Sequence, residues 1–139
     1  MNQILLKKGI DMASSLNKAI LIGRLGKDPE TKFTQGGVAI SKFSIATDEE
    51  WKDRNGEKQK KTEWHNVVAW RRLAEICNQF LVKGKQVYVE GRIETKKWED
   101  KEGNERRTTQ IAADKMIMLS GEGKKEEKKV VEDDDAVVF

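Results

Sequence analysis

The chain has few of the residues that build disulfides, metal centres and catalytic triads. Its 139 residues include one cysteine, Cys77, one histidine, His65, and one proline, Pro29. A single cysteine excludes an internal disulfide and a cysteine-based zinc site. A single histidine excludes a histidine-rich metal centre and argues against a catalytic triad. We therefore predict no enzymatic activity, no catalytic residues, no metal site and no cofactor.

Long apolar runs are also missing. No stretch approaches the roughly 20 apolar residues of a membrane helix. The first 12 residues contain a single short apolar run, at residues 4–6, and no small-residue cleavage site of a secretory signal. The sequence predicts a cytoplasmic protein that makes no contact with a membrane.

The charge is nearly balanced overall but unevenly distributed. The formal net charge is +3, with residues 1–121 carrying +6 and residues 122–139 carrying −3. A basic body attracts polyanions such as nucleic acid, whereas an acidic tail indicates a separate role.

The order of predicted elements indicates an all-β fold with one helix. Apolar residues at positions 73, 76, 77, 80 and 81 follow the period of a helix, which we expect Gly84 to end as its C′ residue. Strands are predicted at residues 18–25, 31–34, 38–47, 62–70, 86–98 and 105–119, with a long polar hairpin loop at 48–61. The apolar alternation slips near Ser41 and Lys42, which predicts a β-bulge there. A helix between the third and fourth of five main strands is the order of the OB-fold barrel.

Composition divides the chain into four parts. Residues 1–14 are predicted to be an N-terminal extension that can be disordered, and residues 15–120 the OB-fold domain. Residues 121–131 are a short Lys/Glu-rich linker, and residues 132–139 form an acidic tip. Since the segment after residue 120 has few core-forming residues, we expect a disordered tail.

Four tryptophans lie among charged residues instead of apolar ones. Trp51 is in a polar loop, and Trp64 lies between Glu63 and His65. Trp70 precedes two arginines, and Trp98 shares its predicted strand face with basic residues. An isolated tryptophan is more often part of a core. Four in cationic settings favour a platform on which bases of a single strand stack while Lys and Arg neutralise phosphates.

Residues 16–119 resemble the bacterial single-stranded DNA-binding protein family. The resemblance is carried by Leu16-Asn17-Lys18, ILIGRLGKDPE, FSIAT, TEWHNVVAW, LAEI, VKGKQVYVEGRI and TKKWEDKEGNERRTTQI, in the family's order and spacing. It implies an OB-fold protomer, a homotetramer, and single-stranded DNA wrapped around it with little sequence specificity. It also gives stacking roles to Trp51, Trp64, Trp70 and Trp98. The basic residues that it implies as phosphate contacts are Lys18, Arg71, Arg72, Lys83, Arg92, Lys96 and Lys97.

The C-terminal tip resembles the acidic peptide by which this family recruits replication, recombination and repair proteins. Its predicted partner-binding residues are Asp133, Asp134, Asp135, Val137, Val138 and Phe139. An acidic peptide that ends in an apolar side chain and a free carboxylate suits a pocket with a basic rim. The family usually has proline where Val138 stands, and its linker is usually longer. The resemblance places the protein in the cytoplasm, on single-stranded DNA of the nucleoid.

Two other interpretations remain open at this point. An OB-fold nuclease would need converging carboxylates, and Asp48, Glu49 and Glu50 are clustered but have no matching constellation elsewhere. An RNA-binding or translation-initiation OB module commonly lacks the four tryptophans and the acidic terminal peptide. His65 and Cys77 are interpreted as structural residues.

Overall fold

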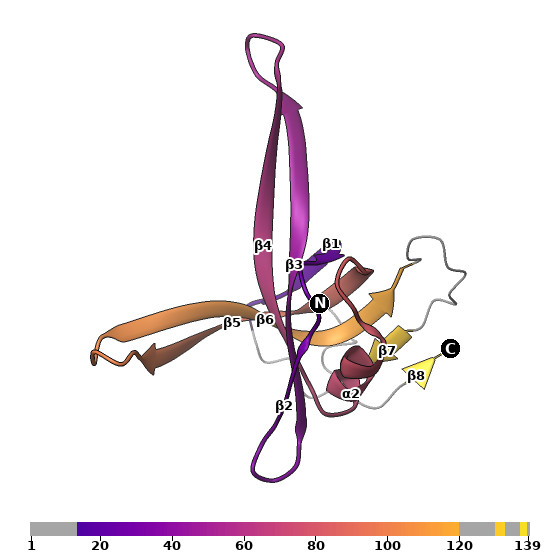
Figure 1. Cartoon of the computed structure of the whole chain (residues 1–139), viewed down its shortest axis with the longest axis vertical. Coiled ribbons are helices and arrows are strands. Elements are labelled where there is room, and N and C mark those ends of the chain that lie inside the picture. Colours follow the sequence, from indigo (N-terminus) through magenta and orange to yellow (C-terminus); the bar gives the residue numbers. More distant parts are fainter. Residues whose placement is uncertain (1–13, 120–129, 133–136, 139) are drawn as a thin grey trace.

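Figure 1 shows the computed structural model of the chain, which describes residues 14–119, 130–132 and 137–138. Most of the predicted N-terminal extension, residues 1–13, lies outside the described residues. In chain order the elements are β1 (Ala19–Leu25), β2 (Glu30–Phe33), β3 (Ala39–Lys52), β4 (Lys58–Trp70), α2 (Arg71–Phe80), β5 (Gln86–Glu99), β6 (Glu105–Met118), β7 (Val130–Glu132) and β8 (Val137–Val138).

Five of these strands close into a barrel in the order β1-β5-β6-β4-β3. β1 pairs antiparallel with β5, β5 with β6, and β3 with β4. β4 runs parallel to β6 at Val67 and Val68, and β3 returns to β1 where Arg24 lies opposite Ala46. With α2 between the third and fourth barrel strands, this arrangement confirms the predicted OB-fold.

Two glycines allow the barrel to close. A Cβ atom on Gly23 would collide with the backbone oxygen of Ala46, and one on Gly91 with the backbone oxygen of Ala112. Gly91 also lies where the register between β5 and β6 shifts, which is where the structure has its β-bulge or irregularity. Bulges bend strands at barrel corners.

The bulge predicted near Ser41 is wrong. The register of β3 with β4 runs without a break from Ile40 opposite Trp70 to Lys52 opposite Lys58. Ser41 is fully buried and occupies an inward position between Ala39 and Phe43. Because Ser41 is polar, its inward position does not show in the apolar pattern. The regular alternation of β3 therefore looks as if it shifts by one residue.

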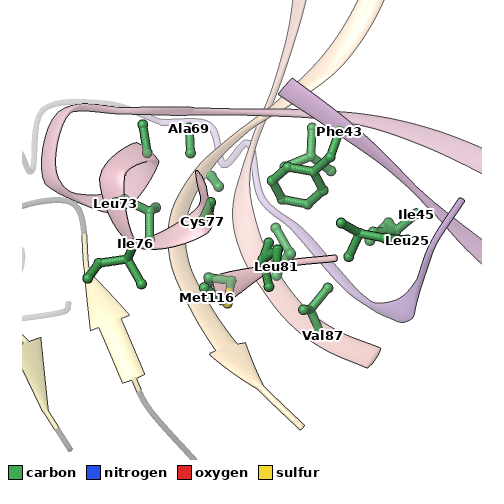
Figure 2. Packing of buried hydrophobic residues seen from close by; sticks show 14 of the residues in the cluster. Leu25, Phe43, Ile45, Ala69, Leu73, Ile76, Cys77, Leu81, Val87 and Met116 are labelled. Atoms are coloured by element: carbon green, nitrogen blue, oxygen red, sulfur yellow. The ribbon is translucent and has the colours of Figure 1, made fainter. Parts of the chain in front are cut away.

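The helix packs against the barrel through the predicted apolar face. Figure 2 shows Leu73, Ile76 and Cys77 of α2 gathered near Met116 of β6, and all four belong to one buried cluster. Burial raises the pKa of the Cys77 thiol to about 12, so the group stays neutral as expected of a core residue.

The role predicted for Gly84 is wrong. The helix ends at Phe80, and its C-cap Leu81 has an extended backbone whose N–H donates to the oxygen of Cys77. Gly84, with φ of +86°, lies instead in the turn closed by the bond from the Lys85 N–H to the Val82 oxygen, 3.1 Å long. A left-handed backbone explains the glycine at this turn.

The long polar loop predicted at residues 48–61 is mostly paired strand. β3 and β4 continue as a two-stranded arm to Lys52 and Lys58, so that only residues 53–57 form the loop. Figure 1 shows this arm projecting from the barrel, with the β5–β6 arm projecting in another direction. Glu49 lies opposite Lys61 and Glu50 opposite Lys60, and such opposite-charge pairs stabilise neighbouring strands.

The described part of the tail adds to the sheet. β7 pairs antiparallel with residues 115–117 of β6, and β8 pairs with β7. The sequence predicts disorder over the whole tail, whereas these two short segments are strands. Valine has high strand propensity, and β6 offers an edge on this side. Residues 120–129, 133–136 and 139 lie outside the described residues.

Candidate nucleic-acid interface

The two arms end in loops with the same internal hydrogen bonds. In residues 53–57, Oδ1 of Asp53 accepts from the backbone N–H groups of Asn55 and Glu57, at 2.9 and 3.0 Å. In residues 100–104, Oδ1 of Asp100 accepts from those of Glu102 and Asn104, both at 2.9 Å. Each aspartate thus organises the tip of one arm.

The second oxygen of each aspartate accepts a hydrogen bond from the side chain of the second residue of the returning strand. Oδ2 of Asp53 accepts from the Gln59 amide at 3.1 Å, and Oδ2 of Asp100 from Nε of Arg106 at 2.9 Å. The backbone N–H of Glu57 lowers the pKa of Asp53, and that of Asn104, followed by Arg106, lowers the pKa of Asp100. Both loops are therefore organised by an ionised carboxylate at neutral pH.

One tryptophan lies near the tip of each arm, one residue pair before the end of the ladder. Trp51 is opposite Gln59, and Trp98 is opposite Arg106. Their side chains are 47% and 49% exposed, respectively. The Trp98 indole N–H donates to Oγ1 of Thr108 at 2.9 Å, which fixes the orientation of the ring.

The other two tryptophans share one face of β4. Trp64 and Trp70 are six residues apart, so alternation along the strand places them on the same side. Trp64 is 56% exposed, and its ring lies against Gly26, where a Cβ atom would collide with it. Trp51 lies opposite Gln59, an odd number of residues from Trp64, and so is on the other face of the ribbon.

A cation already lies over one of the rings. Nζ of Lys96 is 5.9 Å from the centroid of the half-buried Trp70 ring, at the outer limit of a cation–π contact. Lys96 and Trp98 are two residues apart on β5 and therefore share a face. The structure thus places Lys96 over Trp70 and on the same face of β5 as Trp98.

The remaining basic residues predicted at the interface fall into two groups. Lys18 forms an ion pair with Glu90 at 3.3 Å, Arg72 with Glu75 at 3.7 Å, and Arg92 with Asp114 at 3.0 Å. These exposed ion pairs contribute only about 0–1 kcal/mol each, so a phosphate can replace the carboxylate. Arg71, Lys83 and Lys97 are exposed.

Glu90 is the partner of Lys18 in the structure and has a second hydrogen bond of its own. The Tyr88 hydroxyl donates to Oε1 of Glu90 at 2.8 Å, and this bond, with help from Lys18, lowers the pKa of Glu90. The carboxylate is therefore ionised and pairs with the Lys18 ammonium. Lys97, by alternation, is on the opposite face of β5 from Lys96 and Trp98.

Arg71 begins the helix with an unusual backbone. Its φ is +56°, and among the described residues it alone has a positive φ without being glycine. A left-handed backbone is costly for an arginine. Arg71 makes the turn from the Trp70 end of β4 into α2, and its side chain is exposed.

Sequence reasoning missed a small cavity between the first loop and three barrel strands. It has a volume of about 240 Å³ and is lined by Lys27, Asp28, Glu30, Lys42, Phe43, Ser44, Asn66, Val67, Thr108 and Gln110. These residues come from four separate stretches of the chain, and no local pattern marks any of them. The cavity could be predicted only if it were known which strands become neighbours when the barrel closes.

The residues behind the enzyme alternative have other roles in the structure. Asp48 accepts a hydrogen bond from Oγ1 of Thr62 at 2.7 Å, and Glu49 and Glu50 lie opposite lysines of the arm. Nε2 of His65 is 2.9 Å from Oγ1 of Thr47, across the same pair of strands. Among the described residues, no group of three His, Cys, Asp or Glu residues could hold a metal ion.

No helix in the described parts of the chain is long and apolar enough to cross a membrane. Of the predicted partner-binding residues, Val137 and Val138 form β8. Asp133, Asp134, Asp135 and Phe139 lie outside the described residues.

Comparison with known proteins gives consistent matches. The model of the "Single-strand binding protein family" matches residues 16–119. A single-stranded DNA-binding protein of Neisseria meningitidis serogroup A is 53% identical over 107 residues, which cover 77% of this chain and 62% of that protein. Single-stranded DNA-binding protein 1 of Chlorobaculum tepidum is 50% identical over 109 residues, covering 78% and 67%. The chain thus matches less than two thirds of the length of the Neisseria relative.

A solved structure extends the similarity to three dimensions. A chain from the Plasmodium falciparum SSB complex with single-stranded DNA has a TM-score of 0.71 and 37% identity. The match covers 78% of this chain and 98% of that one. The chain described here therefore belongs to the single-strand binding protein family.

Proposed function

We propose that the protein binds single-stranded DNA with little sequence specificity, by stacking bases on Trp51, Trp64, Trp70 and Trp98. The observation that carries the proposal is the placement of Lys96, whose ammonium lies over the Trp70 ring and which shares a face of β5 with Trp98. Stacking suits any base, and the cation neutralises the phosphate that links two stacked bases. The DNA-bound Plasmodium falciparum chain, which is similar in fold, supports it.

The basic side chains contribute phosphate contacts around these rings. Arg71 and Arg72 continue directly from Trp70, and Lys83 lies in the loop after α2. Lys18 and Arg92 exchange their carboxylate partners for phosphate when a strand is bound, and Lys97 extends the contacts along the β5–β6 arm.

A competition titration separates this function from RNA binding. Poly(dT) and an RNA of equal length compete for the full-length protein at one salt concentration. We expect the DNA to compete more strongly. The proposed interface consists of base stacking and phosphate contacts and includes no group that recognises the 2′-hydroxyl of RNA. Stronger competition by the RNA would favour an RNA-binding module, and metal-dependent cleavage of either strand would favour a nuclease.

We also propose that the protein acts as a homotetramer in the cytoplasm, on single-stranded DNA of the nucleoid. Exposed Ile20 and Ile22, two residues apart on β1, support self-association because they offer an apolar face on a barrel strand. Sedimentation of the protein should give four times the protomer mass. A monomer at micromolar concentration would contradict the assembly.

The acidic tip is proposed to recruit replication, recombination and repair proteins through Asp133, Asp134, Asp135, Val137, Val138 and Phe139. Its charge opposes that of the body, so it also competes with DNA for basic residues. Deletion of residues 132–139 should leave the DNA affinity equal or higher and abolish partner binding. Markedly weaker DNA binding after the deletion would contradict this role.

A further inference from the structure

One edge of β6 is open to a further strand beyond the point where β4 leaves it. β4 pairs with β6 only at Ile111 and Ala112, and the chain then turns at Arg71 into α2. β5 covers the other edge of β6 as far as Met118. The edge that β4 leaves therefore presents backbone N–H and C=O groups, and such groups attract an additional strand.

The C-terminal tail occupies this edge. β7 pairs antiparallel with residues 115–117 of β6, and β8 pairs antiparallel with β7. Figure 1 shows β7 and β8 (yellow) beside the end of β6, away from the tips of both arms. Val137 and Val138, which we assign to partner binding, are thus joined to the sheet through their backbone.

The pairing with β6 is what holds the hairpin of β7 and β8. A hairpin of two strands is at best marginally stable in water by itself, and a third strand is needed for independent stability. The pairing with β6 extends only over residues 115–117. Short segments near a chain end open at the lowest free energies in a folded protein. The docked tail is therefore in equilibrium with a released form.

Docking and partner binding exclude each other. The proposed recruitment requires an extended chain end whose apolar side chain and carboxylate enter a pocket. Val137 and Val138 cannot enter that pocket while they are paired with β7. A partner that binds only the released tip has an apparent dissociation constant that increases as the released fraction decreases.

We propose that the open edge of β6 is a docking site for the chain's own acidic tip, and that docking withholds the tip from partner proteins until the hairpin opens. The proposal rests on the proposed recruitment through the tip. The docking site is at the opposite end of β6 from Arg106, which pairs with Trp98 of the arm. It is thus separate from the DNA interface, and only the released tip competes with DNA for basic residues.

Val131→Pro tests the docking because Val131 is in the middle strand of three. β7 is paired on both sides, so a proline there removes a backbone donor and disrupts the ladder whichever neighbour that donor faces. Val131→Thr is the matched control, since it keeps the backbone N–H and a β-branched side chain. Neither substitution alters residues 132–139 or the five barrel strands.

Carboxypeptidase Y is the probe for the released tip, because it needs an extended chain end with a free carboxylate. Mass spectrometry follows the loss of Phe139 and Val138 from the full-length protein. When opening is fast relative to cleavage, the digestion rate follows the released population. We expect digestion of Val131→Pro to be about fivefold faster than that of the unmodified protein, and Val131→Thr to stay within about twofold. Equal rates for all three would overturn the proposal.

Amide hydrogen exchange locates the docked tip. In Val131→Pro, amides within residues 115–118 should exchange faster than in the unmodified protein, because β7 no longer covers this edge of β6. In Val131→Thr they should exchange as in the unmodified protein. Unchanged exchange in Val131→Pro would mean that the tip docks elsewhere, and would overturn the proposal.

Saturating oligo(dT) separates the docking site from the DNA interface. Digestion of the unmodified protein should keep its rate when oligo(dT) is bound, with binding followed by tryptophan fluorescence. Faster digestion would mean that the tip rests on basic residues that DNA takes, and would overturn the docking proposal. Failure to bind oligo(dT) would instead overturn the proposed DNA binding. Partner capture that survives deletion of residues 132–139 would overturn the proposed recruitment.

Discussion

At the scale of single residues, the indoles differ in how firmly they are held. Trp98 is fixed by its bond to Thr108, and Trp64 by its contact with Gly26, while both remain about half exposed. A ring that is already oriented loses little conformational entropy when a base stacks on it. Trp70 is covered instead by Lys96, which must move aside or bind the phosphate when a base arrives.

The substitution Trp98→Ala should weaken binding of single-stranded DNA by about 1–3 kcal/mol, because it removes one stacking surface. Trp98→Phe is the control, since it keeps a ring but loses the indole N–H. Affinities are measured by titration with oligo(dT), and circular dichroism monitors the fold. If Trp98→Ala unfolds the protein, the residue belongs to the core and its assigned role is wrong.

The closing glycines make a second prediction at this scale. Gly23→Ala should destabilise the barrel by about 1–3 kcal/mol, because its Cβ atom meets the backbone oxygen of Ala46. Gly36→Ala is the matched control: the nearest atom to its Cβ, Oγ1 of Thr34, is 3.8 Å away. Denaturant unfolding measures both. Equal stabilities of the two variants would contradict the account of barrel closure.

At the scale of elements, the two arms are built alike, although their sequences differ. Each has an aspartate that accepts two backbone N–H bonds, a glycine with positive φ three residues later, and a tryptophan two residues before the aspartate. The glycine φ values are +77° at Gly56 and +81° at Gly103. The shared construction places one aromatic ring near the end of each arm.

The aspartates predict a pH dependence of these tips. Because the pKa values of Asp53 and Asp100 are lowered by folding, each carboxylate stabilises its loop fully above the ordinary aspartate pKa of 3.8. That stabilisation is lost as the pH falls through the lowered pKa. The amide resonances of Gly56 and Gly103, followed by NMR, should therefore change only below pH 3.8. Changes centred above that pH would contradict the assignment.

Some of the elements can be predicted from the sequence and others cannot. The helix follows from the spacing of Leu73, Ile76 and Cys77, because an apolar face of period 3.6 has one simple explanation. The sequence predicts a loop where the β3–β4 arm lies, because residues 48–61 are polar on both faces. Cross-strand charge pairs such as Glu49 and Lys61 become visible only once the register is known. Ser41 gives the opposite case, because its buried hydroxyl interrupts the apolar pattern of a strand that is in fact regular.

At the scale of the whole molecule, the tryptophans are not on one flat platform. Trp51 is on the opposite face of the β3–β4 ribbon from Trp64, and Trp98 is on the other arm. The two arms project in different directions (Figure 1). A strand that stacks on all four rings must therefore bend around the protein, which agrees with the wrapping that the family resemblance implies.

The candidate site was only partly accessible to sequence reasoning for the same reason. The tryptophans could be named, because each is surrounded by charged neighbours in the chain. The ion pair of Lys18 with Glu90 and the cavity beside Asn66 depend on which strands become neighbours when the barrel closes. Local sequence does not contain that information.

The central claim is that indole rings stack on bases while cations neutralise the phosphates. Titration of the full-length protein with oligo(dT), followed by intrinsic tryptophan fluorescence at several salt concentrations, tests both parts at once. The account predicts saturable quenching, and an affinity whose logarithm falls with the logarithm of salt concentration by about 0.7 per phosphate neutralised. Binding without quenching, or an affinity independent of salt, would contradict it.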